Sequence, residues 1–144
     1  MKILFLDIDG VLNSTRSAIA LGNFPHTTKT LRYFDVIALR LIRKVCKETG
    51  CKICLSSTWR NDKNWEEIGP NLKLPIIDRT PRSLSGYRGK EIEAWLNEHP
   101  EVNQYAIVDD DGDMLEKQHP YFVHTSHSNG FLFEDYEKLL ELLK

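Results

Sequence analysis

The chain has 144 residues, a formal net charge of −2 and 41% hydrophobic residues, which is the size and balance of one folded domain. This charge gives no overall basic surface for nucleic acid or membranes, although a local basic patch is compatible with it. The N-terminal apolar run is short and ends at Asp7, which excludes a signal peptide or a membrane span and predicts a cytoplasmic protein.

Strand-like apolar runs and helical patterns alternate along the chain. We expect strands at 2–6, 52–56, 74–77, 104–108 and 121–124, and helices at 36–49, 64–68, 89–98 and 133–143, with an irregular segment at 13–35. The first apolar run is continuous rather than alternating, which is typical of a strand buried on both faces. This order predicts βαβ units, and therefore an α/β fold with a mostly parallel sheet.

Polar side chains occur where three of the expected strands end. The first strand is followed by two acids and a glycine that allows a close turn, the second by hydroxyls, and the strand at 104–108 by acids. These residues are Asp7, Asp9 and Gly10; Ser56, Ser57 and Thr58; and Asp109, Asp110, Asp111 and Asp113. Ligands of parallel sheets bind beyond the carboxyl ends of the strands, so the three groups predict one site. The alternative for the first group is an Asp-Gly turn whose acids cap the next segment.

The acids that follow the first strand and the strand at 104–108 would converge if these two strands are neighbours. Two carboxylates ~4 Å apart repel by about 4 kcal/mol at an effective dielectric constant of ~20, so such a cluster needs a cation. Hard oxygen ligands favour Mg²⁺. Taken alone, the acids at 109–113 have a simpler alternative, a solvated acidic turn.

The hydroxyl groups and one lysine suit a phosphate. Hydroxyls and backbone N–H groups at a strand end or a helix N-terminus bind phosphate well, whereas N-capping of the next turn is the alternative. Lys90 lies in the first turn of an expected helix, where the helix end is already positive. A lysine there can help to gather an anion, and an ordinary surface lysine is the alternative. Together with the acids, these groups predict a site for one phosphoryl group.

In this order the motifs resemble those of the haloacid dehalogenase (HAD) superfamily of phosphotransferases, over nearly the whole chain. The segment 7–12 resembles the first motif, Ser57 (with Ser56 as its rival) the second, Lys90 the third, and Asp109-Asp110 the fourth. The strings LSSTWR (55–60), RTPR (79–82), RGKEIEAWL (88–96) and NGF (129–131) are similar to a narrower group. That group comprises the HAD domains associated with RNA repair proteins and their stand-alone relatives.

The resemblance implies one HAD-like phosphatase domain over residues 1–144, with a three-layer Rossmannoid sheet and a Mg²⁺ cofactor. Asp7 would be the nucleophile that forms an aspartyl-phosphate, and Asp9 the acid and base. The implied catalytic residues are Asp7, Asp9, Ser57 and Lys90; the substrate-binding residues are Gly10, Ser56, Thr58, Arg60 and Arg88. The implied metal positions are Asp7, Asp9 through its backbone carbonyl, Asp109, Asp110 and Asp113 as an auxiliary acid.

The two segments that could hold a cap domain, 13–35 and 61–89, are both short. We therefore expect no substantial cap domain, and an open site that admits large substrates. Basic and aromatic residues in these segments suit a nucleotide or a phosphorylated nucleic-acid end, within the broader class of phosphorylated small molecules. Ordinary loop composition is the alternative explanation. No membrane and no obligate protein partner are expected.

Two other functions are compatible with such a site: a phosphate-accepting, receiver-like signalling domain and a non-catalytic phosphate-binding module. A receiver carries its phosphoacceptor in mid-chain and its lysine near the end, whereas here Lys90 falls between the two groups of acids. Two metal motifs are not expected to act. Cys51 and Cys54 form a CxxC without a second pair of ligands, and His124 and His127 have no acid partner nearby in sequence.

Overall fold

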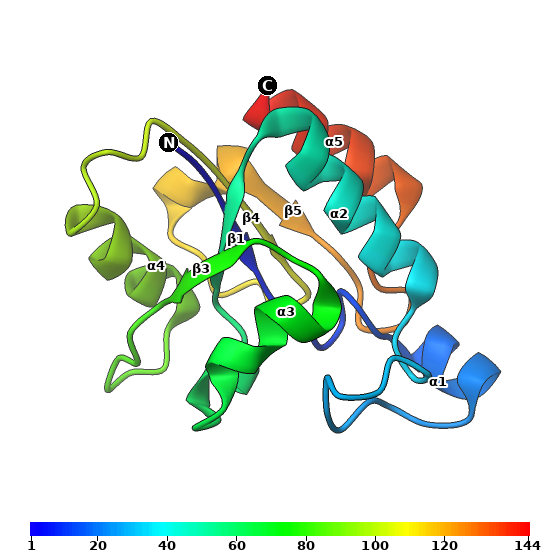
Figure 1. The fold of residues 1–144 in the computed structure, drawn as a ribbon. Helices are drawn as coiled ribbons and strands as arrows, with labels where there is room; N and C mark the ends of the chain where they lie inside the picture. The colour runs from blue at the N-terminus through cyan, green and yellow to red at the C-terminus, as the bar shows by residue number, and fades with distance from the viewer.

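A computed structural model describes all 144 residues and contains one sheet of five parallel strands, in the order β3-β2-β1-β4-β5 (Figure 1). The strands are β1 (Lys2–Leu6), β2 (Lys52–Leu55), β3 (Ile76–Arg79), β4 (Gln104–Asp109) and β5 (Phe122–His124). The predicted α/β fold with a parallel sheet is confirmed. The third strand begins two residues later than predicted, since Leu74 and Pro75 still belong to the turn after the preceding helix.

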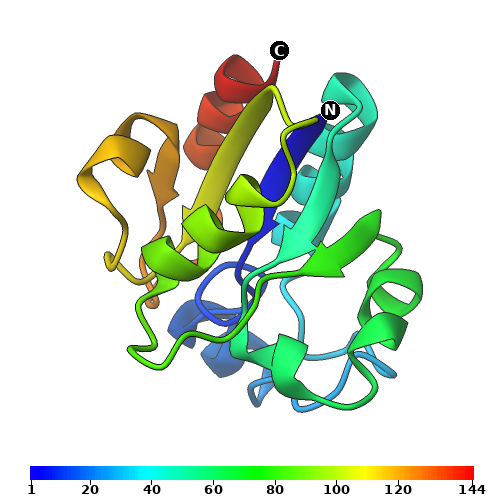
Figure 2. The same ribbon diagram turned by 90° about the vertical axis from the view of Figure 1, so that its left-hand side faces the viewer.

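Helices cover both faces of the sheet and form the predicted three layers (Figures 1 and 2). The helices α2 (Val36–Thr49) and α5 (Phe133–Leu143) lie on one face, and α4 (Arg88–Asn97) lies on the other. The shorter elements are α1 (Thr15–Leu21), α3 (Ile68–Leu72) and the 3₁₀ helices η1 (Thr58–Asn61), η2 (Trp65–Glu67) and η3 (Glu116–Tyr121). None of these helices combines the length and the apolar character that a membrane crossing requires.

The continuous apolar run of β1 is explained by burial on both sides. Leu4 and Leu6 belong to the larger core, a cluster of 24 buried residues under α2 and α5. Ile3 and Phe5 point the other way, into a cluster of 7 that includes Trp95 of α4. Both sets alternate along the same strand, so every position of β1 after Lys2 must be apolar.

The segment 13–35 contains one short helix, α1, which was not predicted. Ser14 and Ser17 form a reciprocal capping box at its start, and Gly22 ends it with a φ of 102°. The one buried residue of the helix is the polar Ser17, and its Ile19 is 80% exposed, so hydrophobic periodicity does not reveal the helix. Neither this segment nor 61–89 contains a folded cap, as expected.

The position of the site follows from the order in which the chain forms the strands of the sheet. From β1 the chain proceeds outward to β2 and β3, and then returns to the opposite side of β1 for β4 and β5. The strand order therefore reverses between β1 and β4, which is where ligands bind in open α/β sheets. Ladder hydrogen bonds continue past the strand ends, from the Asp7 amide to Val108 and from the Ser56 amide to Leu6. The polar residues after β1, β2 and β4 consequently lie side by side at one edge.

Candidate active site

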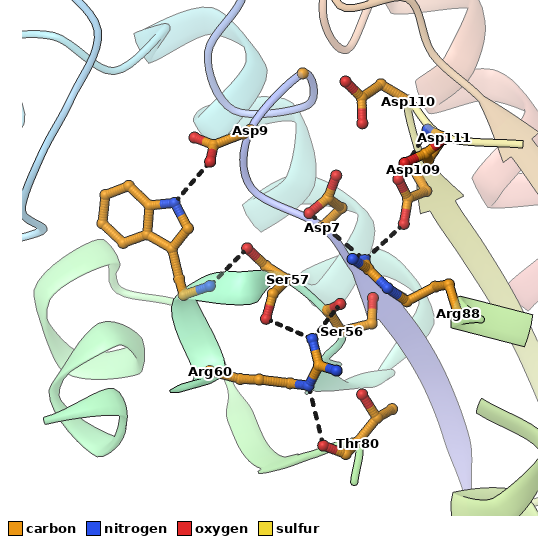
Figure 3. Close-up of polar contacts among 12 residues, drawn as sticks. Asp7, Asp9, Ser56, Ser57, Arg60, Thr80, Arg88, Asp109, Asp110 and Asp111 are labelled. Carbon is orange, nitrogen blue, oxygen red and sulfur yellow. Dashed lines mark hydrogen bonds and ion pairs between the residues drawn. The ribbon is translucent and has the colours of Figure 1, made fainter. Parts of the chain in front are cut away.

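Three acids meet at the reversal point of the sheet. Carboxylate oxygens of Asp7, Asp109 and Asp110 all lie within 4.8 Å of one another (Figure 3). Asp7 and Asp109 are buried, with exposed fractions of 6% and 0%, whereas Asp110 is half-buried. The predicted convergence of the acids from β1 and β4 is therefore what the fold produces, and one side of the cluster faces solvent.

Burial makes this cluster unfavourable for negative charge. Burial, followed by the charge of Asp109, raises the pKa of Asp7 well above its ordinary value, while Arg88 opposes the rise. Burial also raises the pKa of Asp109 to about 6, again opposed by Arg88. A divalent cation would offset the repulsion, and three hard carboxylate ligands at one open edge fit Mg²⁺, which keeps part of its water shell.

Gly10 lets Asp110 reach the cluster. Its φ is +81°, and a Cβ atom at this position would lie 2.1 Å from the Asp110 carboxylate. The Gly10 carbonyl accepts a hydrogen bond of 2.7 Å from the Thr125 hydroxyl, which ties the loop after β1 to the segment after β5. A side chain at position 10 would therefore displace a candidate metal ligand.

The cation beside the acids is Arg88, not Lys90. One guanidinium nitrogen of Arg88 donates to Asp109 at 2.8 Å and lies 3.7 Å from Asp7 (Figure 3). Lys90 is exposed, and its ammonium group lies 5.9 Å from the ring centre of Tyr87. Two residues along an α-helix correspond to a rotation of about 200°, so the two side chains leave α4 on opposite sides. A cation therefore lies beside the acids at the start of α4, as expected, but it is Arg88 rather than Lys90.

Asp9 lies in different surroundings from Asp7. It is exposed, and its two carboxylate oxygens accept hydrogen bonds from the Asn13 amide at 2.9 Å and the Trp59 indole N–H at 3.1 Å. These two donors hold the carboxylate at the rim of the site, between the loop after β1 and the turn after β2. Asp9 is therefore fixed in position while it stays in contact with solvent.

The hydroxyl residues after β2 divide into buried and exposed positions. Ser56 and Ser57 are fully buried, and the Ser56 hydroxyl has no hydrogen-bond partner. The Ser57 hydroxyl accepts a hydrogen bond of 3.1 Å from the Trp59 amide, which makes it the N-cap of η1 and leaves its own proton free to donate. Thr58 is exposed at the first position of η1. Ser57 thus caps η1, which was the alternative to phosphate binding, and its hydroxyl still keeps a donor for an anion.

Arg60 supports the backbone of the site through hydrogen bonds and does not line the acid cluster. Its buried guanidinium donates to the carbonyls of Ser56, Ser57 and Thr80 (Figure 3), and it also donates to the Glu91 carboxylate at 2.9 Å. This is a buried, hydrogen-bonded ion pair, of the kind in which removal of one partner leaves an uncompensated charge. Arg60 is expected from the sequence among the substrate-binding residues. In the structure, its N–H donors hold the turn after β2 in place.

Asp113 lies outside the acid cluster. One of its carboxylate oxygens accepts a hydrogen bond of 3.0 Å from the Arg88 backbone amide, and the other is buried without a partner. An acid at this position satisfies a free N–H at the start of α4 and so helps to orient the helix that carries Arg88.

Two residues of the site were not identified from the sequence. Trp59 stands in the LSSTWR string, but nothing in the sequence indicates its contact with Asp9, because the two residues are 50 positions apart. Glu91 is 3% exposed and accepts from Arg60 and from the Ser83 amide. Its position on the same helical stripe as Ile92 and Trp95, which are both buried, is the sequence signal for a buried acid.

The cysteines and histidines form no metal centre. All three cysteines are free and buried, with the Cys46 and Cys51 sulfur atoms 3.7 Å apart. His127 does find an acid partner in space, because its Nδ1 lies 3.2 Å from the Asp110 carboxylate, and His124 contacts the Asp110 backbone carbonyl. These contacts hold Asp110 through both its side chain and its backbone carbonyl.

Comparison with known proteins agrees with this site. Residues 3–136 match the family described as the HAD domain in Swiss Army Knife RNA repair proteins. A search of curated proteins gave no significant match. Membership in a HAD family indicates phosphatase-type hydrolysis, and the family's description places such domains in RNA repair. Because the match covers nearly the whole chain, this protein belongs to the family of HAD domains found in Swiss Army Knife RNA repair proteins.

Proposed function

We propose that this protein is a Mg²⁺-dependent phosphomonoester hydrolase that acts through an aspartyl-phosphate intermediate. The observation that carries the proposal is the contrast between two acids of one loop. Asp7 is buried beside Asp109, Asp110 and Arg88, whereas Asp9 is exposed and held by Trp59. One acid is thus suited to bind and attack a phosphoryl group, and the other to exchange protons with water.

Asp7 is the proposed nucleophile. Its carboxylate oxygen attacks phosphorus, the bond from phosphorus to the ester oxygen breaks, and an aspartyl-phosphate forms. Asp7, Asp109, Asp110 and the Asp9 backbone carbonyl would hold Mg²⁺, which supplies positive charge to the acids and to the phosphate. Arg88 adds a second positive charge at the same point, 3.7 Å from Asp7. Its position supports the attack of one anion on another.

Asp9 is the proposed acid and base. In the first step it donates a proton to the oxygen of the leaving group, and in the second it takes a proton from the water that attacks the aspartyl-phosphate. Two hydrogen-bond donors hold its carboxylate, and its exposure gives water access. The Ser57 hydroxyl and the Thr58 backbone amide are the proposed ligands of the phosphoryl oxygens opposite Arg88.

The proposed substrate is a nucleotide or the phosphorylated end of a nucleic acid. The family's connection with RNA repair supports this class. The absence of a cap from the two segments beside the site also supports it, since a strand end can reach an open edge. A site with the acids of a HAD domain also favours turnover over the stable phosphorylation of a receiver domain.

The test is hydrolysis of p-nitrophenyl phosphate by the purified protein with and without Mg²⁺. Asp7→Asn is expected to lower kcat by at least about a thousandfold, because the amide of asparagine cannot take the place of the attacking carboxylate. Asp111→Asn, which changes an exposed acid of the same edge, is the matched control and should stay within about twofold of the wild type. Full activity of Asp7→Asn would overturn the assignment of the nucleophile. A phosphorylated protein that persists without turnover would indicate a receiver.

A further inference from the structure

We propose that the hollow beside Trp59 binds the nucleoside that carries the scissile phosphate. This inference rests on the proposed function and names the part of the substrate that the function leaves open. The hollow has a volume of about 550 Å³, within the range of roughly 300–1,000 Å³ that is usual for small-molecule sites. It lies between the loop of residues 26–29, the first turn of η1 and the segment 62–68.

The position of the hollow follows from the role of Asp9. An acid that protonates the leaving oxygen must lie on the side of the phosphate from which the leaving group departs. Trp59 donates its indole N–H to Asp9 and at the same time lines the hollow. A group attached to the leaving oxygen therefore meets the Trp59 ring first, and the hollow lies directly beyond it.

The lining of the hollow suits a base and a sugar. The Trp59 ring is half-buried: it packs against the larger core and lies tilted to Phe34 with ring centres 5.9 Å apart, and it offers an aromatic surface to the hollow that it lines. Thr58 and Asn64 add a hydroxyl and an amide, and the Asn64 side chain makes no capping hydrogen bond to η2. Stacking on an aromatic ring together with a few polar contacts is how proteins bind single nucleotides.

The charges of the hollow argue against a second phosphate inside it. Asp62 and Glu67 line it against a single lysine, Lys29, so that its formal charge is −1 with His26 neutral. A second hollow of about 320 Å³, to which η1 contributes Arg60, is also lined by Arg79 and Arg82 and has no acid. The hollow beside Trp59 is thus the one of the two that favours an uncharged nucleoside.

The first experiment compares the kcat/KM values for AMP, glucose 6-phosphate and glycerol phosphate in the presence of Mg²⁺. We expect a preference for AMP over the other two of about tenfold or more, because only AMP carries a base that can stack on Trp59. Asn64→Ala should reduce the preference severalfold, and Asn97→Ala, an exposed asparagine at the far end of α4, should leave it unchanged. Equal kcat/KM values for the three substrates, or equal effects of the two variants, would overturn the inference.

A second phosphate tests the charge argument. Adenosine 3′,5′-bisphosphate should be a poorer substrate than AMP, and Glu67→Lys should narrow the difference. If Glu67→Lys leaves the difference between the two substrates unchanged, the acids of the hollow do not select against a second phosphate, and this part of the inference is overturned.

A binding measurement separates this inference from the proposed function. Adenosine, which carries no phosphate, is titrated into the protein while the indole N–H signal of Trp59 is followed by NMR and identified through its loss in Trp59→Phe. A saturable shift supports the hollow as a nucleoside site even if no phosphoester is hydrolysed, in which case only the proposed function fails. Hydrolysis of AMP without any shift of this signal by adenosine overturns the inference and leaves the proposed function intact.

Discussion

Asp7 and Asp9 are separated by one residue, yet the fold places their carboxylates in opposite surroundings. Asp7 is 6% exposed and shares its space with Asp109 and Arg88, while Asp9 is exposed beside Trp59. The cause is where β1 ends. Asp7 still belongs to the sheet through the bond of its amide to Val108, whereas the chain from Ile8 onward turns away from it.

This difference shows how one short loop can divide the work of a site. A carboxylate buried with other acids binds cations and is shielded from water, which suits attack on phosphorus. A carboxylate at the rim is in contact with water, which suits the transfer of protons to and from the leaving group and water. Changes on the buried side and on the open side should therefore have different kinetic signatures.

The largest effect in this comparison is expected for Asp9→Asn with a poor leaving group. With glycerol phosphate, kcat/KM should fall by about a thousandfold, because an amide cannot protonate the departing alkoxide. With p-nitrophenyl phosphate the loss in kcat/KM should be much smaller, since nitrophenolate leaves without a proton. The ratio of the two kcat/KM values is the measurement, because it excludes the later hydrolysis of the aspartyl-phosphate, in which Asp9 would act as the base for both substrates; Asp111→Asn is the control. Equal losses of kcat/KM on both substrates would show that Asp9 does not protonate the leaving group.

A matched pair of variants on α4 tests the buried side. Arg88→Ala should lower kcat by about a hundredfold, because it removes the positive charge beside Asp7 and Asp109. Lys90→Ala should change kcat by about twofold or less, since its ammonium group is directed toward Tyr87. Arg88→Lys should recover part of the activity. A larger loss in Lys90→Ala than in Arg88→Ala would contradict the assignment of Arg88 and restore Lys90 as the cation of the site.

The pH dependence of Mg²⁺ binding tests the same side. Because burial raises the pKa of Asp109 to about 6, protons compete with the metal below this pH, and affinity should fall by about tenfold per pH unit there. In the metal-free protein, folding stability depends on pH in the opposite direction. The folded pKa lies above the ordinary 3.8, so the stability that protonated Asp109 contributes is lost as the pH rises through about 6.

The measurement is the increase in Tm that Mg²⁺ causes, which should be larger at pH 8 than at pH 5. Asp109→Asn is the matched control, since it keeps the shape of the side chain and removes its charge. In this variant the Mg²⁺-dependent increase should be absent at both pH values. An increase in Tm that is the same at pH 5 and pH 8 in the wild type would argue against Asp109 as a metal ligand.

The strands and the acid cluster could be predicted because each depends on local pattern. The run at 2–6 is continuously apolar, and β1 has these bounds because both faces of the strand are covered. Asp7 and Asp109 come together because β1 and β4 are neighbours, a condition that the structure meets; the alternation of strands and helices predicts a parallel sheet but not the order of its strands. The site's position at one edge of the sheet follows from the same pattern.

The direction of individual side chains could not be predicted in this way. The choice between Arg88 and Lys90 depends on how α4 is rotated about its axis, at about 100° per residue, and that is set by packing against the sheet. The contact of Trp59 with Asp9 depends on two loops that meet only after folding. A sequence pattern places such residues near the site but does not indicate which of them touch it.

The smallest effect is expected where the open side meets the hollow beside Trp59. Trp59→Phe keeps an aromatic ring but removes the indole N–H that donates to Asp9 at 3.1 Å. One hydrogen bond of this kind contributes about 1 kcal/mol, so kcat should fall by about three- to fivefold. The KM for AMP should change little, because the ring remains available for stacking. Trp65→Phe, whose ring lies under Arg79, is the control and should change neither constant. A raised KM with an unchanged kcat in Trp59→Phe would mean that the indole N–H binds substrate rather than positioning Asp9. Trp59 would then not connect the proposed acid and base with the hollow.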